Sequence, residues 1–264
     1  MSELPTPNLI FQFNNYISTA LGIENILRLL QALSQILATQ PTVDVLEVEH
    51  WRILGRQFSL GRRYFRYFQF LTYFRNAWDT FSGKHESVSR RGRAALSIEV
   101  CMLSSYGIYL LLEAFTILDA LGVHSTEWSR MMLVEANKFW FYAILFSILS
   151  NVWQIICAQL TLDTSQLGGH EERRGGNASL NSSRSKKSKK SGAEGSITGQ
   201  SKRTELHPKA SSLARNLIVN GCDLLMPGAF VGWIDVSPLV VSSAMVLSTV
   251  LVGRDRWVKA QGKM

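Results

Sequence analysis

Two long stretches without a charged residue constrain this chain more than any other feature. Residues 139–162 contain no Asp, Glu, Lys or Arg. A helix of that length, rising about 1.5 Å per residue, crosses the hydrocarbon core of a bilayer. Residues 236–253 form the second stretch, and a collar of basic residues follows it: Arg254, Arg256, Lys259 and Lys263. Such a collar is typical of the end of a span that is not translocated, so we expect membrane spans over 139–162 and 231–253.

A third apolar stretch, residues 94–123, carries three carboxylates: Glu99, Glu113 and Asp119. Carboxylates are costly inside a bilayer, so this stretch makes a poor free-standing span. The predicted fold class is therefore all-α, a membrane-associated helical protein with amphipathic N-terminal helices and two to three hydrophobic membrane helices. The hydrophobic helices are expected within residues 94–162 and 211–264.

Composition favours contact with a membrane. The chain has 264 residues, of which 46% are apolar and 18% charged, so it can bury a core and is not wholly disordered. Lys and Arg number 28 against 20 Asp and Glu, which gives a formal charge of +8. A chain that is both basic and apolar favours an anionic phospholipid membrane as partner, and no nucleic acid. The three cysteines are far apart, which predicts inert thiols in a reducing compartment.

Residues 1–83 are predicted to form an amphipathic helical region that remodels membranes. Apolar residues recur at helical spacing from residue 8 to 39, and the pattern ends at Gln40-Pro41. A second pattern, from residue 60 to 78, places mostly aromatic side chains on one helix face: Leu60, Tyr64, Tyr67, Leu71, Phe74 and Trp78. Arginines accompany this face, namely Arg62, Arg63 and Arg66. The combination predicts a helix lying in the surface of an anionic membrane, and the alternative is an ordinary core helix.

Residues 163–210 are rich in Gly, Ser, Lys and Arg and predict a disordered basic linker. Five serines in it lie among the basic residues: Ser182, Ser183, Ser185, Ser188 and Ser191. Phosphorylation would add about −1.5 to −2 charges at each and cancel the nearby cations. The linker is therefore either a phosphorylation switch for membrane adhesion or a solvated spacer.

No motif for catalysis is present in the sequence. The chain lacks a P-loop, a dinucleotide fingerprint, an HExxH zinc motif and a GxSxG nucleophile motif, and its five histidines are scattered singly. We expect neither an enzyme nor a cofactor. Glu99 and Glu113 share a helix face and, with Asp235, are candidates for the polar lining of a small-metabolite pore. The alternative for the two glutamates is an interfacial helix whose acids face water or arginines.

Three short motifs follow one another along the chain in the same order as the motifs of a known protein family. Residues 22–32, with Gly22, Arg28 and Gln31, resemble a Gly-x-Asp-Lys-x-x-Arg-x-x-Gln-Tyr run in which Glu24-Asn25 replaces Asp-Lys and Ala32 replaces Tyr. Residues 61–68 are similar to a basic Arg-Lys-x-x-Arg-x-Gly-aromatic motif, with Tyr67 at the small position. Residues 215–257 hold a similar closing pattern: Arg215-Asn216, Asp223 to Pro227, Ser242-Ser243 and Trp257.

These motifs resemble the peroxisomal biogenesis factor 11 family, the peroxin-11 proteins, and cover most of the chain outside the linker. The resemblance implies a peroxisomal membrane protein, multi-pass or tightly bound, that elongates and divides peroxisomes. It also implies self-association into a homo-oligomer and recruitment of the organelle-division machinery. The runner-up functions are a small-metabolite pore in the peroxisomal membrane and a soluble helical adaptor.

Overall fold

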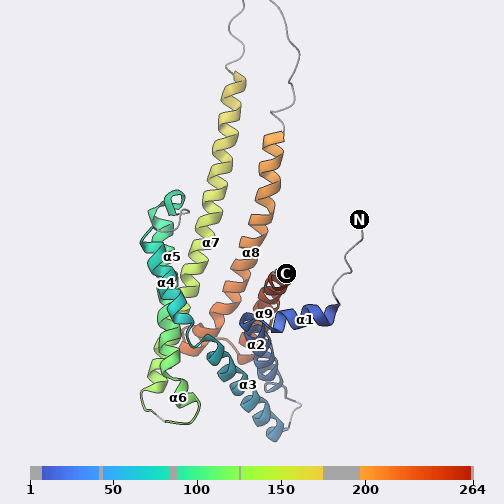
Figure 1. Cartoon of the computed structure of the whole chain (residues 1–264), viewed down its shortest axis with the longest axis vertical. Coiled ribbons are helices and arrows are strands. Elements are labelled where there is room, and N and C mark those ends of the chain that lie inside the picture. The colour runs from blue at the N-terminus through green and yellow to red at the C-terminus, as the bar shows by residue number, and fades with distance from the viewer. Residues whose placement is uncertain (1–7, 42–43, 84–87, 125, 175–196, 263–264) are drawn as a thin grey trace, which may run out of the picture. The chain divides into compact units, whose positions relative to one another are not determined.

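The computed structural model describes residues 8–41, 44–83, 88–124, 126–174 and 197–262, and the regular secondary structure of these residues is entirely helical (Figure 1). The predicted all-α fold class is confirmed. The helices in chain order are α1 (Leu9–Ile17), α2 (Ala20–Leu37), α3 (Val45–Arg66), α4 (Gln69–Phe81), α5 (Val88–Phe115), α6 (Ile117–Ala120), α7 (Ser129–Arg174), α8 (Ile197–Val231) and α9 (Pro238–Gln261).

The chain divides into two units. The first comprises residues 1–149 and 217–264, and therefore contains α1 to α6, the start of α7, the end of α8 and all of α9. The second comprises residues 150–216, to which the remaining parts of α7 and α8 belong.

The single helix expected over residues 8–39 is two helices, because a new N-cap at Thr19 starts a second helix. α1 ends at Ile17, and the hydroxyl oxygen of Thr19 accepts a hydrogen bond from the amide of Gly22 at 3.0 Å. Threonine in this position satisfies an otherwise unpaired amide and starts α2. α2 ends at Leu37, ahead of Pro41 as the sequence predicts.

The helix expected over residues 60–78 is also divided, between Arg66 and Gln69. Neither glycine nor proline causes this break, so packing accounts for it. α3 packs against α2, whereas α4 packs along α5, and the two parts of the pattern thus bury their inner faces against different neighbours (Figure 1). α4 stops at Phe81, and Gly83 follows with a φ of +68°, in the polar break that the sequence predicts.

Three helices of the described chain are long and apolar enough to cross a membrane: Arg93–Phe115 in α5, Ser129–Cys157 in α7 and Pro238–Gln261. The first of these overlaps residues 94–123, the stretch that the sequence predicted to be a poor span because of its carboxylates. The last begins later than the expected residue 231, because Gly232, at a φ of +82°, ends α8 and Ser237 caps α9 ahead of Pro238.

Helix extends into both ends of the segment expected to be a disordered linker. α7 continues to Arg174 and α8 begins at Ile197. A helix already under way gains one hydrogen bond for each residue it adds, which explains how polar sequence can continue it. Residues 175–196, which contain the five serines of the expected phosphorylation switch, lie outside the described residues.

An aromatic core joins α4, α5 and the start of α7. Tyr109, Leu110 and Ala136 are its buried centre. The Tyr109 and Trp140 rings stack with their centroids 5.2 Å apart, and Tyr73 stacks on Tyr106 at 5.3 Å. Stacked aromatic pairs add to the stabilisation that burial itself provides.

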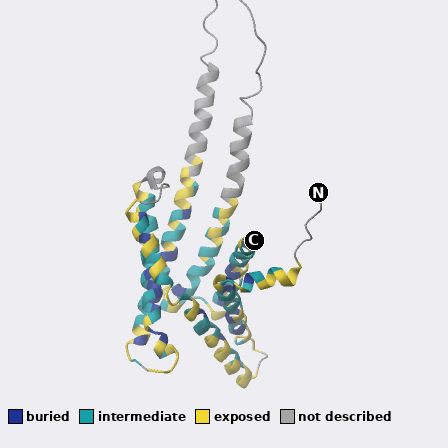
Figure 2. Cartoon of the chain, in the orientation of Figure 1, coloured by how far each residue is buried: buried dark blue, intermediate teal, exposed yellow. Residues whose placement is uncertain are grey.

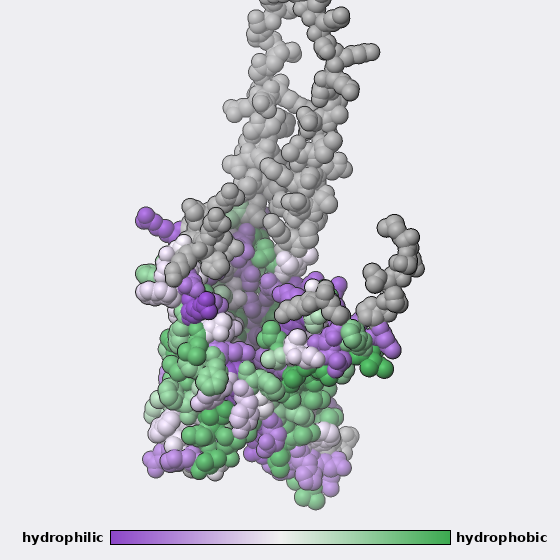
Figure 3. Space-filling view, in the orientation of Figure 1, coloured by the Kyte–Doolittle hydropathy of each residue, from purple (hydrophilic) through white to green (hydrophobic). Residues whose placement is uncertain are grey.

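The helix α2 has a different arrangement: several of its large apolar side chains are exposed and several polar ones are buried. Leu30 and Leu33 are exposed, while Gln31 and Ser34 are buried. Figure 2 shows how buried, intermediate and exposed residues alternate along the helices of the first unit. Large apolar areas cover the visible face of this unit (Figure 3). Only 17%, 17% and 22% of the residues in the three candidate spans are buried, so most residues of each span keep some surface open to the surroundings.

Candidate functional site

The inner face of α2 carries a row of polar residues at steps of three: Asn25, Arg28, Gln31 and Ser34. Residues three apart lie on the same side of a helix. α2 is clasped between α9 and α3, and this row faces them. The polar row is therefore the contact surface of α2 within the first unit, and its partners come from distant parts of the chain.

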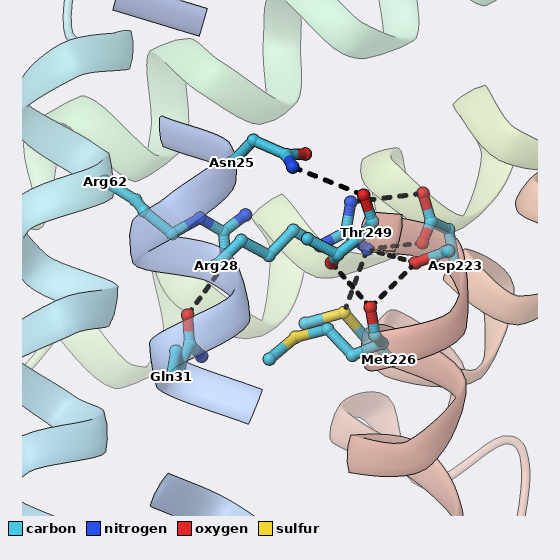
Figure 4. A network of polar contacts seen from close by, with 9 residues as sticks. Asn25, Arg28, Gln31, Arg62, Asp223, Met226 and Thr249 are labelled. Atoms are coloured by element: carbon cyan, nitrogen blue, oxygen red, sulfur yellow. Dashed lines mark hydrogen bonds and ion pairs between the residues drawn. The ribbon is translucent and has the colours of Figure 1, made fainter. Parts of the chain in front are cut away.

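Arg28 joins α2 to α8 and α9. One guanidinium nitrogen lies 3.4 Å from a carboxylate oxygen of Asp223, and the other bonds the second oxygen of that carboxylate (Figure 4). The same nitrogen donates to the hydroxyl of Ser248 at 3.0 Å. Both partners of the ion pair are largely buried. Two-pronged contact between guanidinium and carboxylate fixes orientation as well as charge.

Asn25 makes the next contact along the row. Its amide nitrogen donates to the backbone oxygen of Thr249 at 3.2 Å (Figure 4). Gly253 lies beside it on α9, where an added Cβ would stand 2.7 Å from that same amide nitrogen. Close by, the rings of Tyr16 and Trp257 meet with centroids 5.4 Å apart. The N-terminal and C-terminal helices are thus joined at several points.

Arg62, Arg63 and Arg66 of α3 point into the first unit, where two carboxylates meet them. Arg66 donates to both oxygens of Glu113, at 3.0 and 3.2 Å, and lies 3.7 Å from Glu24. Arg63 lies 3.5 Å from Glu113. The side chains of Glu24 and Glu113 are largely buried. These contacts attach α3 to both α2 and α5.

Arg62 differs from its neighbours because it has no carboxylate within ion-pair distance among the described residues. It is only 5% exposed and donates to the side-chain oxygen of Gln31 at 2.8 Å (Figure 4). Burial, followed by the positive charges of Arg66 and Arg28, lowers the pKa of Arg62 to about 9. The pKa of Arg66 is raised instead: burial acts to lower it, but Glu113, Tyr109 and Glu24 together outweigh that effect. Three arginines face two glutamates here, and the unmatched charge is on Arg62.

These arginines border a cavity of about 950 Å³. α2, α3, α5, α7, α8 and α9 all contribute to its wall. Charged side chains gather on the α3 side, and apolar residues such as Trp140, Phe230 and Val241 complete the opposite side. The first unit therefore contains a cavity of the size of a ligand site.

The peroxisomal biogenesis factor 11 (PEX11) family model matches residues 11–257. The chain belongs to this family. No curated protein and no solved structure matches it. Membership makes the chain a peroxisome biogenesis factor associated with the peroxisomal membrane, and the family is described by that role rather than by an enzymatic reaction.

The peroxin-11 motifs meet in space. Within residues 22–32, Arg28 contacts Asp223 of the closing motif, and Gln31 contacts Arg62 of the middle motif. Ser242 of the closing motif contacts Gln35, just beyond the first motif. Gly22 is buried, and the position needs glycine because a Cβ there would stand 2.0 Å from the backbone oxygen of Tyr16. The motif residues that resemble the family thus build the polar interior of the first unit.

The structure places the predicted membrane-contact residues in two groups. Tyr64, Tyr67, Leu71 and Trp78 are exposed, while Leu60 and Phe74 are half-buried. The arginines point inward, where their partners are protein side chains. Lipid contact by Arg62, Arg63 and Arg66 stays a prediction, and it would require these partners to be exchanged.

The three carboxylates predicted to line a pore are not gathered together. Glu113 lies on the cavity wall, but Glu99 and Asp235 are not among its lining residues in the described chain, and Asp235 is exposed between α8 and α9. The sequence motifs include Gln31 and Asp223, but sequence reasoning gave these two residues no contact or role and did not single out the polar row of α2. The repeat of polar residues at steps of three was the available signal.

Proposed function

We propose that this peroxin-11 protein elongates the peroxisomal membrane and so drives peroxisome proliferation and division. The observation that carries the proposal is the combination of span-length helices with two short helices whose apolar side chains are exposed. α1 and α4 contain 9 and 13 residues. At about 1.5 Å per residue they reach about 14 and 20 Å, too short for a hydrocarbon core of about 30 Å.

The outward faces of these short helices suit the boundary between lipid headgroups and acyl chains. α1 has no charged residue and exposes Leu9, Ile10 and Phe13. α4 exposes Leu71, Trp78 and Phe81. A helix that lies in one leaflet widens that leaflet relative to the other, and the membrane curves in response. In this proposal, long helices hold the protein in the membrane while α1 and α4 bend it.

The experiment compares variants of the full-length protein in cells that lack their own peroxin-11 proteins. Leu71→Ser with Trp78→Ser removes two of the three large apolar side chains on the outward face of α4 without changing a buried residue. We expect peroxisomes to remain short and few, although the protein stays in the membrane after alkaline extraction. Thr72→Ala with Asn76→Ala, two exposed polar positions on α4, should elongate peroxisomes as the parent does. Normal elongation by the first double variant would contradict the proposal.

A second candidate function is the small-metabolite pore, and the cavity beside Glu113 is the observation that favours it. Solute release from preloaded vesicles containing the purified protein tests this function separately from elongation. Self-association and recruitment of the division machinery stay predictions from the family resemblance. Crosslinking of the protein in isolated peroxisomes would test both.

A further inference from the structure

The charge on the cavity wall is unbalanced. Five arginines line the cavity: Arg52, Arg56, Arg62, Arg63 and Arg66. Glu49 and Glu113 are the lining carboxylates. Five positive and two negative charges leave a formal excess of three positive charges on the wall of this partly open cavity. Glu24, which pairs with Arg66 from outside the lining, reduces the excess to two. Such a wall attracts anions more strongly than an exposed surface would, because the surrounding protein screens charge less than water does.

Arg62 is the buried member of this wall. Its terminal nitrogen bonds a neutral group, the Gln31 amide oxygen. Its Nε, like those of Arg63 and Arg66, has no hydrogen-bond partner among the described residues. A buried cation costs free energy unless an anion or several acceptors compensate it. The nearby carboxylate of Glu113 pairs with Arg63 and Arg66 instead, so no described residue supplies a compensating anion within ion-pair distance of Arg62, and a bound ligand would supply it.

We propose that the cavity binds a molecule carrying a phosphate group, with Arg62 at the base of the site. Guanidinium groups match the geometry of phosphate oxygens with paired hydrogen bonds, and several arginines can share one phosphate. A phosphate monoester carries about −1.5 to −2 charges near pH 7, which offsets most of the excess. This inference goes beyond membrane elongation and does not depend on it.

The remainder of the cavity indicates what is attached to the phosphate. Its volume of about 950 Å³ is at the upper end for small-molecule sites, and it leaves room beyond a bare phosphate. Gln35, Asn137 and Ser242 offer neutral hydrogen-bonding groups, and Leu133, Trp140 and Phe230 offer apolar surface. The wall therefore fits a phosphate with a partly polar and partly apolar body, either a lipid headgroup or a soluble phosphorylated metabolite.

The test measures thermal unfolding of the full-length protein in phosphatidylcholine nanodiscs while inorganic phosphate is titrated, with sodium chloride of equal ionic strength as control. A ligand that binds only the folded state raises the unfolding temperature in proportion to its occupancy. We expect phosphate to raise it and chloride not to. Arg62→Gln should weaken the apparent phosphate affinity about tenfold or more, because a charge-assisted hydrogen bond is lost.

Arg75→Gln is the matched control. It removes the same charge from an exposed side chain on α4, outside the cavity, and should leave the affinity for phosphate unchanged. Ser59→Glu is a second test variant, to be used if Arg62→Gln does not fold. Ser59 lines the cavity one helical turn before Arg62, so a carboxylate there should stabilise the protein without ligand and abolish its response to phosphate.

A second titration replaces part of the phosphatidylcholine with phosphatidic acid, whose headgroup is a phosphate monoester. Stabilisation by phosphatidic acid alone identifies a lipid as the ligand, and stabilisation by soluble phosphate alone identifies a metabolite. Either result supports the proposed site if the stabilisation is lost in the Arg62→Gln or the Ser59→Glu variant. The proposal is overturned if neither source stabilises the parent protein, or if Arg75→Gln weakens the response as much as Arg62→Gln does.

Discussion

Arg28 and Asp223 illustrate at the scale of single residues what holds this fold together. They are separated by 195 positions in the chain, and both are largely buried. The resemblance to the peroxin-11 family includes both residues, and their ion pair gives a physical reason for this. An arginine alone in this interior would be a buried charge without compensation, and so would an aspartate.

We therefore predict that Asp223→Asn lowers the free energy of unfolding by about 3–5 kcal/mol, as expected when one partner of a buried ion pair is removed. Arg75→Ala breaks an exposed ion pair with Asp79 and should cost about 0–1 kcal/mol. Denaturant unfolding of the purified protein in detergent, followed by circular dichroism, measures both values. Equal costs for the two variants would show that the Arg28–Asp223 pair is unimportant for stability.

Two glycines make a second matched pair. An alanine at Gly22 would place its Cβ 2.0 Å from the Tyr16 backbone oxygen, so the turn between α1 and α2 would have to shift. We predict that Gly22→Ala destabilises the protein by about 1–3 kcal/mol. Gly221 lies inside α8 with no atom within 4 Å of its added Cβ, so Gly221→Ala should stabilise by about 1 kcal/mol. The same unfolding measurement distinguishes them, and a neutral Gly22→Ala would refute the close contact.

At the scale of elements, the contact between α4 and α5 is as close as it is because Gly107 lies opposite Phe74. A Cβ at Gly107 would stand 2.6 Å from the phenylalanine ring. The ring occupies space that any larger residue would need, which explains why Phe74 is half-buried although it belongs to the aromatic face of the sequence pattern.

Gly107→Val should therefore push α4 away from α5 and destabilise the protein by about 1–3 kcal/mol. Adding Phe74→Ala should recover part of that loss, because the smaller side chain vacates the space that valine needs. The four proteins of this double-mutant cycle are compared by thermal unfolding. Strictly additive effects would mean that the two residues do not touch.

At the scale of the whole molecule, the sequence predicts where helices form more reliably than which way they face. Helical spacing and the long uncharged stretches are local features of the sequence. The all-α class and the stretches able to span a membrane could therefore be predicted from it. The division between Arg66 and Gln69 was not, because it arises from packing of α3 on α2 and α4 on α5 rather than from glycine or proline.

The direction of a helix face depends on the solvent. An amphipathic pattern such as that of α2 predicts one apolar and one polar face. In water the apolar face turns toward the protein interior, whereas in lipid the polar face does. Leu30 lies outside and Gln31 inside, the arrangement that lipid would favour. The cavity could not be predicted from the sequence either, because Gln31, Arg62 and Glu113 approach one another only in the folded chain.

Membrane elongation by this protein requires that the apolar outer side chains of the first unit lie in lipid. Spin labels attached to cysteines at Leu30, Leu33 and Ser34, one at a time in full-length protein reconstituted in vesicles, measure this directly. Labels at Leu30 and Leu33 should collide with oxygen, which concentrates in lipid, far more often than with a water-soluble nickel chelate, and the label at Ser34 should be shielded from both. Labels at Leu30 and Leu33 that collide mainly with the nickel chelate would place the apolar face in water and contradict the proposed function.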